Sequence, residues 1–176
     1  MPRLNTISPD KAVGHTAEVY GAIKKSLGSV PNLFQAMGTN ADVLQTFLGL
    51  GPSLKLLSGS EQEAIALTVA QKNNCNYCLA AHTLLGTMNG LSKEETLRIR
   101  RGQSENDKRQ ALIRFVGEVV AEKGHVSDAT IEGFRAAGYT DAHVPEVMLA
   151  IVINIYTNYF NHINQTVVDF PSVEKI

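Results

Sequence analysis

Residues 58–90 read SGSEQEAIALTVAQKNNCNYCLAAHTLLGTMNG and contain two helical patterns joined by a short polar turn. The first is an alanine-rich run with strong helix propensity, and Ser60 is expected to start it by forming a capping box with Glu63. The second is expected to run from about Asn76 to Met88 and to end at Asn89–Gly90. Both cysteines of the chain lie where this second helix begins, so the helix pair is expected to carry the chemistry of the protein.

The rest of the chain also favours helices. Apolar side chains recur at three- and four-residue steps in nearly every segment between turn signals, and few stretches alternate as strands do. Gly51–Pro52 is expected to break or bend one helix, because proline lacks an amide proton. Ser92, Ser127 and Asp141 are expected to cap later helices. The sequence therefore predicts an all-α fold of eight or nine helices in a single domain, residues 1–176.

The composition argues against several classes of partner. Lys and Arg total 16 while Asp and Glu total 17, and these charges are scattered, so neither a nucleic acid nor a membrane is expected as a partner. The start of the chain has no apolar core of signal-peptide length, and the longest apolar run, Val147–Ile153, is far too short to span a membrane. A soluble, cytoplasmic protein is expected. In that reducing compartment the two cysteines are not expected to be a structural staple.

The two cysteines and one of the five histidines lie within eight positions. Cys75 falls at the N-cap or first turn of the second helix, where free amide protons and the helix dipole favour a thiolate. Cys78 and His82 follow at spacings of three and four residues, so the three side chains form one column. The histidine can take the proton of the Cys78 thiol and make it a nucleophile. Cys75 can then condense with a sulfenic acid to form a disulfide.

Other uses of these residues remain open. The cysteines could simply fill the core. A zinc site is disfavoured, because Cys75, Cys78 and His82 supply three ligands from one helix face without a second cysteine pair, and no metal is expected. Glu63 lies on the inward face of the first helix and could relay protons to the histidine, although the capping box with Ser60 would explain it structurally.

Glu63, Cys75, Cys78 and His82 are separated by eleven, two and three residues. This spacing resembles the signature of the alkylhydroperoxidase D (AhpD-like) family, in the peroxidase-related branch of the carboxymuconolactone decarboxylase superfamily. The resemblance covers most of the chain, including LSGSEQEAIALTVAQKNNCNYCLAAHT and the tail NYFNHINQTVVDFP. It implies an AhpD-like helical fold and thiol-dependent reduction of organic hydroperoxides. In that reading Cys78 is peroxidatic, Cys75 is resolving, and Glu63 and His82 relay protons.

The resemblance also implies partners. It predicts a homo-oligomer, a trimer or hexamer, and a thiol reductant such as a thioredoxin-like or lipoyl-bearing protein. Well-studied members carry a histidine immediately before the second cysteine, where this chain has Tyr77, so a shorter relay is expected here. Tyr77 could wall the pocket, donate a proton, or lie partly exposed at an oligomer contact. No haem, flavin or nicotinamide signature is visible, and no cofactor is expected.

The C-terminal helix, about residues 141–167, carries several amides on an otherwise apolar segment. Buried amides need hydrogen-bond partners. One interpretation is an interface helix whose polar side chains bond across subunits. The other is that Asn158 or His162 lines the dithiol pocket, of this or of a neighbouring subunit.

Two further functions stay open beside the peroxidase. The superfamily takes its name from a decarboxylase that acts on a γ-lactone without a Cys-x-x-Cys dithiol, so a decarboxylase-like lyase is one alternative. The other is a redox-sensing, non-enzymatic oligomer whose disulfide changes the state of assembly.

Overall fold

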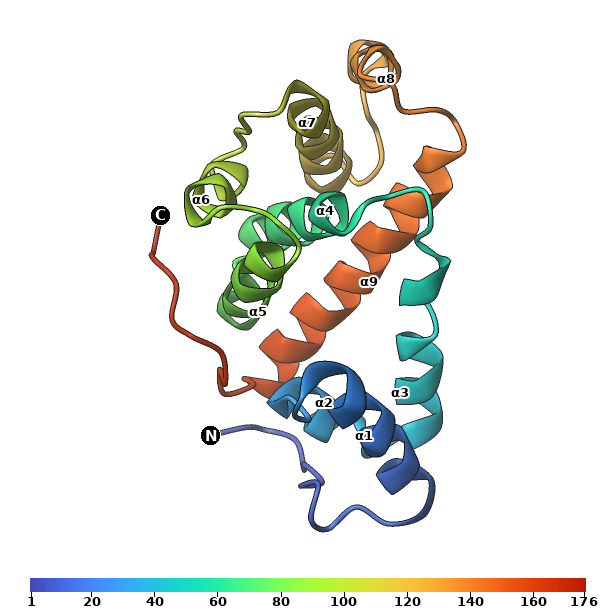
Figure 1. The fold of residues 1–176 in the computed structure, drawn as a ribbon, viewed down its shortest axis with the longest axis vertical. Coiled ribbons are helices and arrows are strands. Elements are labelled where there is room, and N and C mark those ends of the chain that lie inside the picture. Colours follow the sequence, from blue (N-terminus) through green and yellow to red (C-terminus); the bar gives the residue numbers. More distant parts are fainter.

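Figure 1 shows the fold of the chain, a computed structural model that describes all 176 residues. The molecule is built from α-helices and one short 3-10 helix without any strand, which confirms the all-α prediction. The α-helices are α1 Gly14–Leu27, α2 Asn32–Met37, α3 Ala41–Leu48, α4 Gly59–Lys72, α5 Asn76–Met88, α6 Lys93–Arg100, α7 Asp107–Ala121, α8 Asp128–Ala136 and α9 His143–Asn164.

Helices α4 and α5 pack against each other after a tight turn. Asn74 adopts a left-handed conformation with φ of 54°, which asparagine tolerates better than most residues. The next amide, Cys75 N–H, donates to the carbonyl of Ala70 at 2.9 Å and closes the end of α4. The chain therefore turns back on itself directly before α5, and this turn places Cys75 at the start of that helix.

Helix α9 links the two ends of the molecule. Figure 1 shows it running across the middle, with α4 to α7 on one side and α1 to α3 around its C-terminal half and far side. It contacts α4 and α5 as well as α2. As a result, residues from the end of the sequence lie beside the cysteine-bearing helix.

The interior is divided into two apolar clusters. The first contains 17 buried residues, mostly from the first five helices, and includes Cys75, Tyr77 and Cys78. The second surrounds Phe134, whose ring stacks on Phe115 and on Tyr139 with centroid separations of 4.5 and 4.4 Å. Both cysteines therefore belong to a hydrophobic core and not to the surface.

The predicted start of α4 is wrong by two residues. Its N-cap is Ser58, which forms the capping box with Glu61, and Ser60 and Glu63 take no part in it. Burial raises the pKa of Glu61, but hydrogen bonds from Tyr139 and Ser58 outweigh this and lower it to about 2. The helix is capped by Ser58 and not by Ser60 because Glu61, the carboxylate of the Ser58 capping box, also accepts a hydrogen bond from the distant Tyr139 hydroxyl at 2.7 Å.

Several other boundaries agree with the sequence. Helix α3 ends at Leu48, and the 3-10 helix Gly51–Ser53 follows at the expected proline. Ser92 and Ser127 cap α6 and α8 through hydrogen bonds that their side chains accept from backbone amides. These caps are local devices, which explains why they can be predicted from sequence.

The last helix is shorter than the predicted 141–167. Asp141 is not its cap: the N-cap position is Ala142, which makes no side-chain hydrogen bond, and Asp141 instead pairs with Arg135 at 2.8 Å. The helix stops at Asn164, because Gln165 adopts a left-handed conformation with φ of 51°. None of the helices combines the length and the apolar composition needed to cross a bilayer.

Candidate functional site

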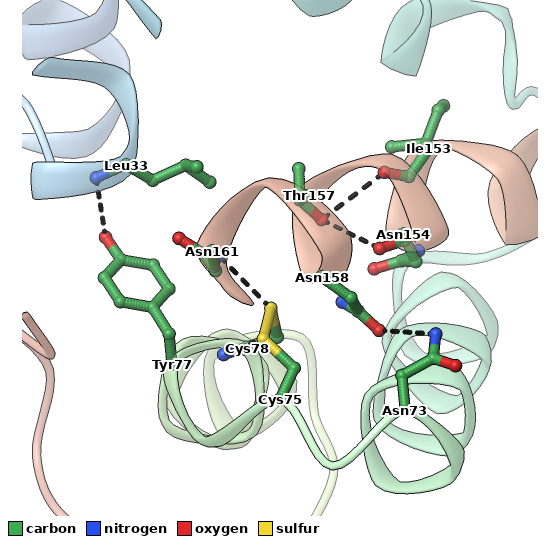
Figure 2. The surroundings of a disulfide bond; sticks show 10 residues. All are labelled: Leu33, Asn73, Cys75, Tyr77, Cys78, Ile153, Asn154, Thr157, Asn158 and Asn161. Carbon is green, nitrogen blue, oxygen red and sulfur yellow. Dashed lines mark hydrogen bonds between the residues drawn. A yellow bond between two sulfur atoms is a disulfide. The ribbon is translucent and has the colours of Figure 1, made fainter. Parts of the chain in front are cut away.

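The two cysteines form a buried disulfide at the start of α5. Cys75 is the N-cap residue, as the sequence predicts, and its Sγ accepts a hydrogen bond from the Cys78 N–H at 3.3 Å. Both residues are almost fully enclosed, with exposed fractions of 1% and 2%. Figure 2 shows the sulfur pair lying between the first turn of α5 and the side chains of α9.

A cavity of about 370 Å³ lies against one of the two sulfurs. Cys78 lines it and Cys75 does not. Most of the remaining wall is apolar, and three phenylalanine rings contribute to it: Phe34, Phe47 and Phe170. A molecule in this cavity would therefore meet Cys78 first, because Cys75 lies behind it.

Glu63 and His82 meet at the wall of the same cavity. Oε2 of Glu63 lies 2.8 Å from Nδ1 of His82, and both side chains line the cavity. The bond joins α4 to α5, and it is possible because Glu61, not Glu63, serves the capping box. The capping-box explanation for Glu63 is therefore wrong. Nε2 is the ring nitrogen that remains for proton exchange.

Tyr77 forms a neutral wall of the cavity. The interpretation as a partly exposed aromatic is wrong, because the residue is buried among the residues of the first cluster. Its hydroxyl oxygen accepts the Leu33 N–H at 3.2 Å, and Phe170 meets its ring edge-on at 5.4 Å. Burial is the main cause that raises the pKa of Tyr77 above its usual range, and the nearby Asp169 carboxylate acts in the same direction.

Helix α9 supplies a polar strip to the cavity, but not through the two residues singled out from the sequence. His162 is exposed and does not line the cavity. Asn158 is fully buried, yet it faces α4, where its Oδ1 accepts from Asn73 Nδ2 at 3.0 Å. The strip is formed instead by Asn154, Thr157 and Asn161.

The physical reason is the orientation of α9. Positions 154, 157 and 161 are spaced by three and four residues and share one helix face. Asn158 lies at the edge of that face beside α4, where it bonds Asn73, and His162 lies further round the helix. In the sequence, the spacing of these polar residues within an otherwise apolar helix was the signal for a polar strip. The sequence alone did not specify which face turns to the sulfurs. No three His, Cys, Asp or Glu side chains converge in a way that could hold a metal ion.

Comparison with known families and structures adds independent findings. Residues 42–105, which contain α4 and α5, match the model of the carboxymuconolactone decarboxylase family. Among curated proteins there is no match. A solved structure described as an AhpD-core, peroxidase-related protein from Ralstonia eutropha JMP134 is 18% identical, with a TM-score of 0.84 over 96% of this chain and 92% of that chain.

Two other solved structures are also similar. A peroxidase-related protein from Silicibacter sp. TM1040 is 21% identical, with a TM-score of 0.78 over 86% of this chain and 83% of that one. A variant of the debrominase Bmp8 in complex with 2,3,4-tribromopyrrole is 17% identical, with a TM-score of 0.77 over 96% and 94%. Identities this low establish the fold and leave the reaction to the site itself. Residues 42–105 therefore match the carboxymuconolactone decarboxylase family model, and the chain as a whole has an AhpD-like fold.

Proposed function

We propose that the protein is a thiol-dependent peroxidase that reduces organic hydroperoxides through a Cys75–Cys78 dithiol and disulfide cycle. The observation that carries this proposal is the position of Cys78, which is half of the disulfide and also faces the cavity lined by His82 and Glu63. A nucleophilic sulfur, a base one helical turn away and an apolar chamber are the parts that this chemistry needs.

The reaction begins with the reduced protein. His82 takes the proton of the Cys78 thiol, and the thiolate attacks one oxygen of the hydroperoxide. An S–O bond forms while the O–O bond breaks, and the alkoxide takes up a proton and leaves as an alcohol. The Cys75 thiol then attacks the sulfenic acid, so that water leaves and the disulfide forms. Two thiols of an external reductant restore the dithiol and are themselves oxidised to a disulfide.

Glu63 acts through His82. Its carboxylate occupies Nδ1, so the proton exchanged with the sulfur or the alkoxide passes through Nε2. Once His82 has accepted a proton, the carboxylate stabilises the imidazolium. The relay consists of these two side chains, because Tyr77 stands where the well-studied family members carry a further histidine.

The cavity supports an organic substrate over hydrogen peroxide. Its walls are mostly apolar, and its volume of about 370 Å³ is in the range of small-molecule pockets. Burying apolar surface contributes about 25 cal/mol per Å², and hydrogen peroxide has no such surface to bury. Alkyl and aryl hydroperoxides should therefore react with the higher kcat/KM.

The partners belong to the same proposal. The reductant is a dithiol carrier, such as a thioredoxin-like or lipoyl-bearing protein. A homo-oligomer is supported by a row of exposed apolar side chains along one face of α9, since such a continuous patch is typical of an interface. The row consists of Met148, Val152, Tyr156, Tyr159 and Ile163.

The experiment that tests the proposal is hydroperoxide consumption in the presence of excess dithiol. Wild type should turn over, Cys78→Ser should be inactive, and Cys75→Ser should consume one equivalent and stop. His82→Ala should be slow. If wild type and both serine variants are equally inert, the dithiol is not a peroxidase centre.

A second candidate function is reductive dehalogenation, because a structural relative is described as a debrominase. The apolar walls and three phenylalanine rings of the cavity also suit a halogenated ring. In that reaction, hydrogen replaces bromine on the ring, bromide and a proton leave, and the dithiol becomes the disulfide. Release of bromide from tribromopyrrole, without consumption of hydroperoxide, would favour this candidate.

The two remaining alternatives predict different outcomes in the same experiments. Turnover of a γ-lactone by a variant lacking both thiols would indicate a lyase. A single oxidation without cycling, accompanied by a change in oligomer mass, would indicate a redox sensor.

A further inference from the structure

Asn161 is the one residue whose side chain donates a hydrogen bond to a sulfur of the disulfide. Its Nδ2 lies 3.4 Å from Cys78 Sγ, and Figure 2 shows the amide reaching from α9 to the sulfur. Because a disulfide sulfur carries no hydrogen, the amide nitrogen is the donor in this pair. Asn161 is buried, with an exposed fraction of 4%, and it lines the cavity.

The other half of this amide has no partner. Oδ1 of Asn161 is buried and accepts no hydrogen bond. An unpaired buried acceptor is costly, and an apolar side chain of similar size would avoid the cost in this core. The chain keeps a polar group where stability alone favours an apolar one, which points to a role in the chemistry of the sulfur.

The two sulfurs differ in the hydrogen-bond donors that the backbone offers them. Cys75 sits at the N-cap of α5, where its Sγ accepts the backbone amide of Cys78, so the helix N-terminus stabilises a thiolate on Cys75. Cys78 faces the cavity but receives no backbone donor. The Asn161 amide supplies the donor that Cys78 otherwise lacks.

The titratable groups around Cys78 come from three elements. Helix α5 contributes His82 and Tyr77, α4 contributes Glu63, and the C-terminal segment contributes Asp169 beside the Tyr77 hydroxyl. None of them donates a hydrogen bond to the sulfur of the disulfide. The polar groups that α9 adds to the cavity wall are amides and a hydroxyl, and none of them titrates. An apolar substitution at position 161 therefore changes the hydrogen bond and leaves every charge in place.

We propose that Asn161 is a further catalytic residue, whose amide N–H stabilises the thiolate of Cys78. A reductant thiolate attacks Cys78 Sγ, the sulfur that lines the cavity, so that the S–S bond breaks and its electron pair passes to Cys75 Sγ. The second thiol of the reductant then attacks the reductant sulfur of this mixed disulfide, and the electron pair of that bond passes to Cys78 Sγ, which the Asn161 amide already contacts. The same hydrogen bond then holds the thiolate ready to attack a substrate in the cavity. This inference rests on the proposed function in one respect, namely that Cys78 is the attacking sulfur.

The test measures the thiol pKa of Cys78 without any peroxide. In a Cys75→Ser background Cys78 is the only thiol, and its ionisation is followed by the ultraviolet absorbance of the thiolate. Asn161→Leu should raise this pKa by about one unit, and Asn161→Asp should raise it further because a negative charge then lies beside the sulfur. Asn158→Leu is the matched control: Asn158 is also a buried asparagine of α9, but it bonds Asn73 and should leave the thiol pKa unchanged.

Circular dichroism and thermal unfolding report whether each variant is folded. A folded Asn161→Leu variant with the parent pKa would overturn the inference. A shift of equal size in Asn158→Leu would also overturn it, since this would indicate a general effect of packing. If Asn161→Leu does not fold, Asn161→Asp decides, and an unchanged pKa there refutes the role of the amide. A shifted pKa in a protein that leaves hydroperoxides untouched would support the inference and refute the proposed function.

Discussion

Replacing Glu63 by glutamine tests the proton relay, because the change removes the negative charge and keeps the size of the side chain. The bond from Glu63 to His82 is 2.8 Å long, and the two side chains are largely shielded, with exposed fractions of 13% and 23%. A hydrogen bond to a charged group contributes about 1.5 to 3 kcal/mol. Since about 1.4 kcal/mol corresponds to a tenfold change in rate, kcat/KM for an organic hydroperoxide should fall about 10- to 100-fold.

Glu61→Gln is the matched control for this variant. It is the same change two residues earlier on α4, but that carboxylate accepts from Tyr139 and Ser58 and does not touch the histidine. It should lower stability and leave the rate near that of wild type. The assay is a single turnover of reduced protein with hydroperoxide, so that the reductant does not limit the rate. Equal rates for Glu63→Gln and wild type, together with a slow His82→Ala, would refute a role for Glu63 and leave the histidine acting alone.

Three other outcomes concern stability and assembly. Ionised Glu61 contributes stability above pH 4.5, and this stability is lost as the pH falls towards its folded-state pKa of about 2. The Tm of Glu61→Gln should therefore depend less steeply on acid pH than the Tm of wild type, and parallel curves would contradict this. Tyr77→Phe leaves the buried Leu33 N–H without its acceptor, so it should lower the free energy of unfolding, measured in urea, by about 1 to 3 kcal/mol. No change would mean that another acceptor replaces the hydroxyl. Val152→Glu and Tyr159→Glu place charges on the exposed face of α9, so each should reduce the oligomer mass measured by sedimentation. An unchanged mass would argue against an interface on that face.

Local signals allowed the sequence to predict the cysteine-bearing helix. Cys75 is the N-cap, α5 has the expected bounds, and Cys78 and His82 line one cavity because residues four apart share a helix face. Each of these features depends on residues within a few positions of one another. The chain needs no distant contact to place the two sulfurs and the imidazole in one column.

The register of α4 shows where local reasoning stops. Ser58-x-x-Glu61 and Ser60-x-x-Glu63 both fit a capping box, and nothing nearby distinguishes them. The difference comes from Tyr139, which is 78 residues away from Glu61 and donates its hydroxyl proton to that carboxylate. Because Glu61 forms the capping box, Glu63 is available to form its hydrogen bond with His82. A tertiary contact at one end of the helix thus decides which carboxylate is available for chemistry.

The same reasoning applies to the amide of α9. Asn161 lies 83 residues from Cys78, and only the packing of α9 against α5 turns its face to the sulfur. The Cys-x-x-Cys motif fixes the distance between two thiols, but it does not determine which of them is the better nucleophile or what can approach it. We propose that the Asn161 donor and the phenylalanine-lined cavity supply those properties. Relatives with the same cysteine spacing are therefore expected to differ in chemistry according to the residues that α9 and the cavity walls present to the second cysteine.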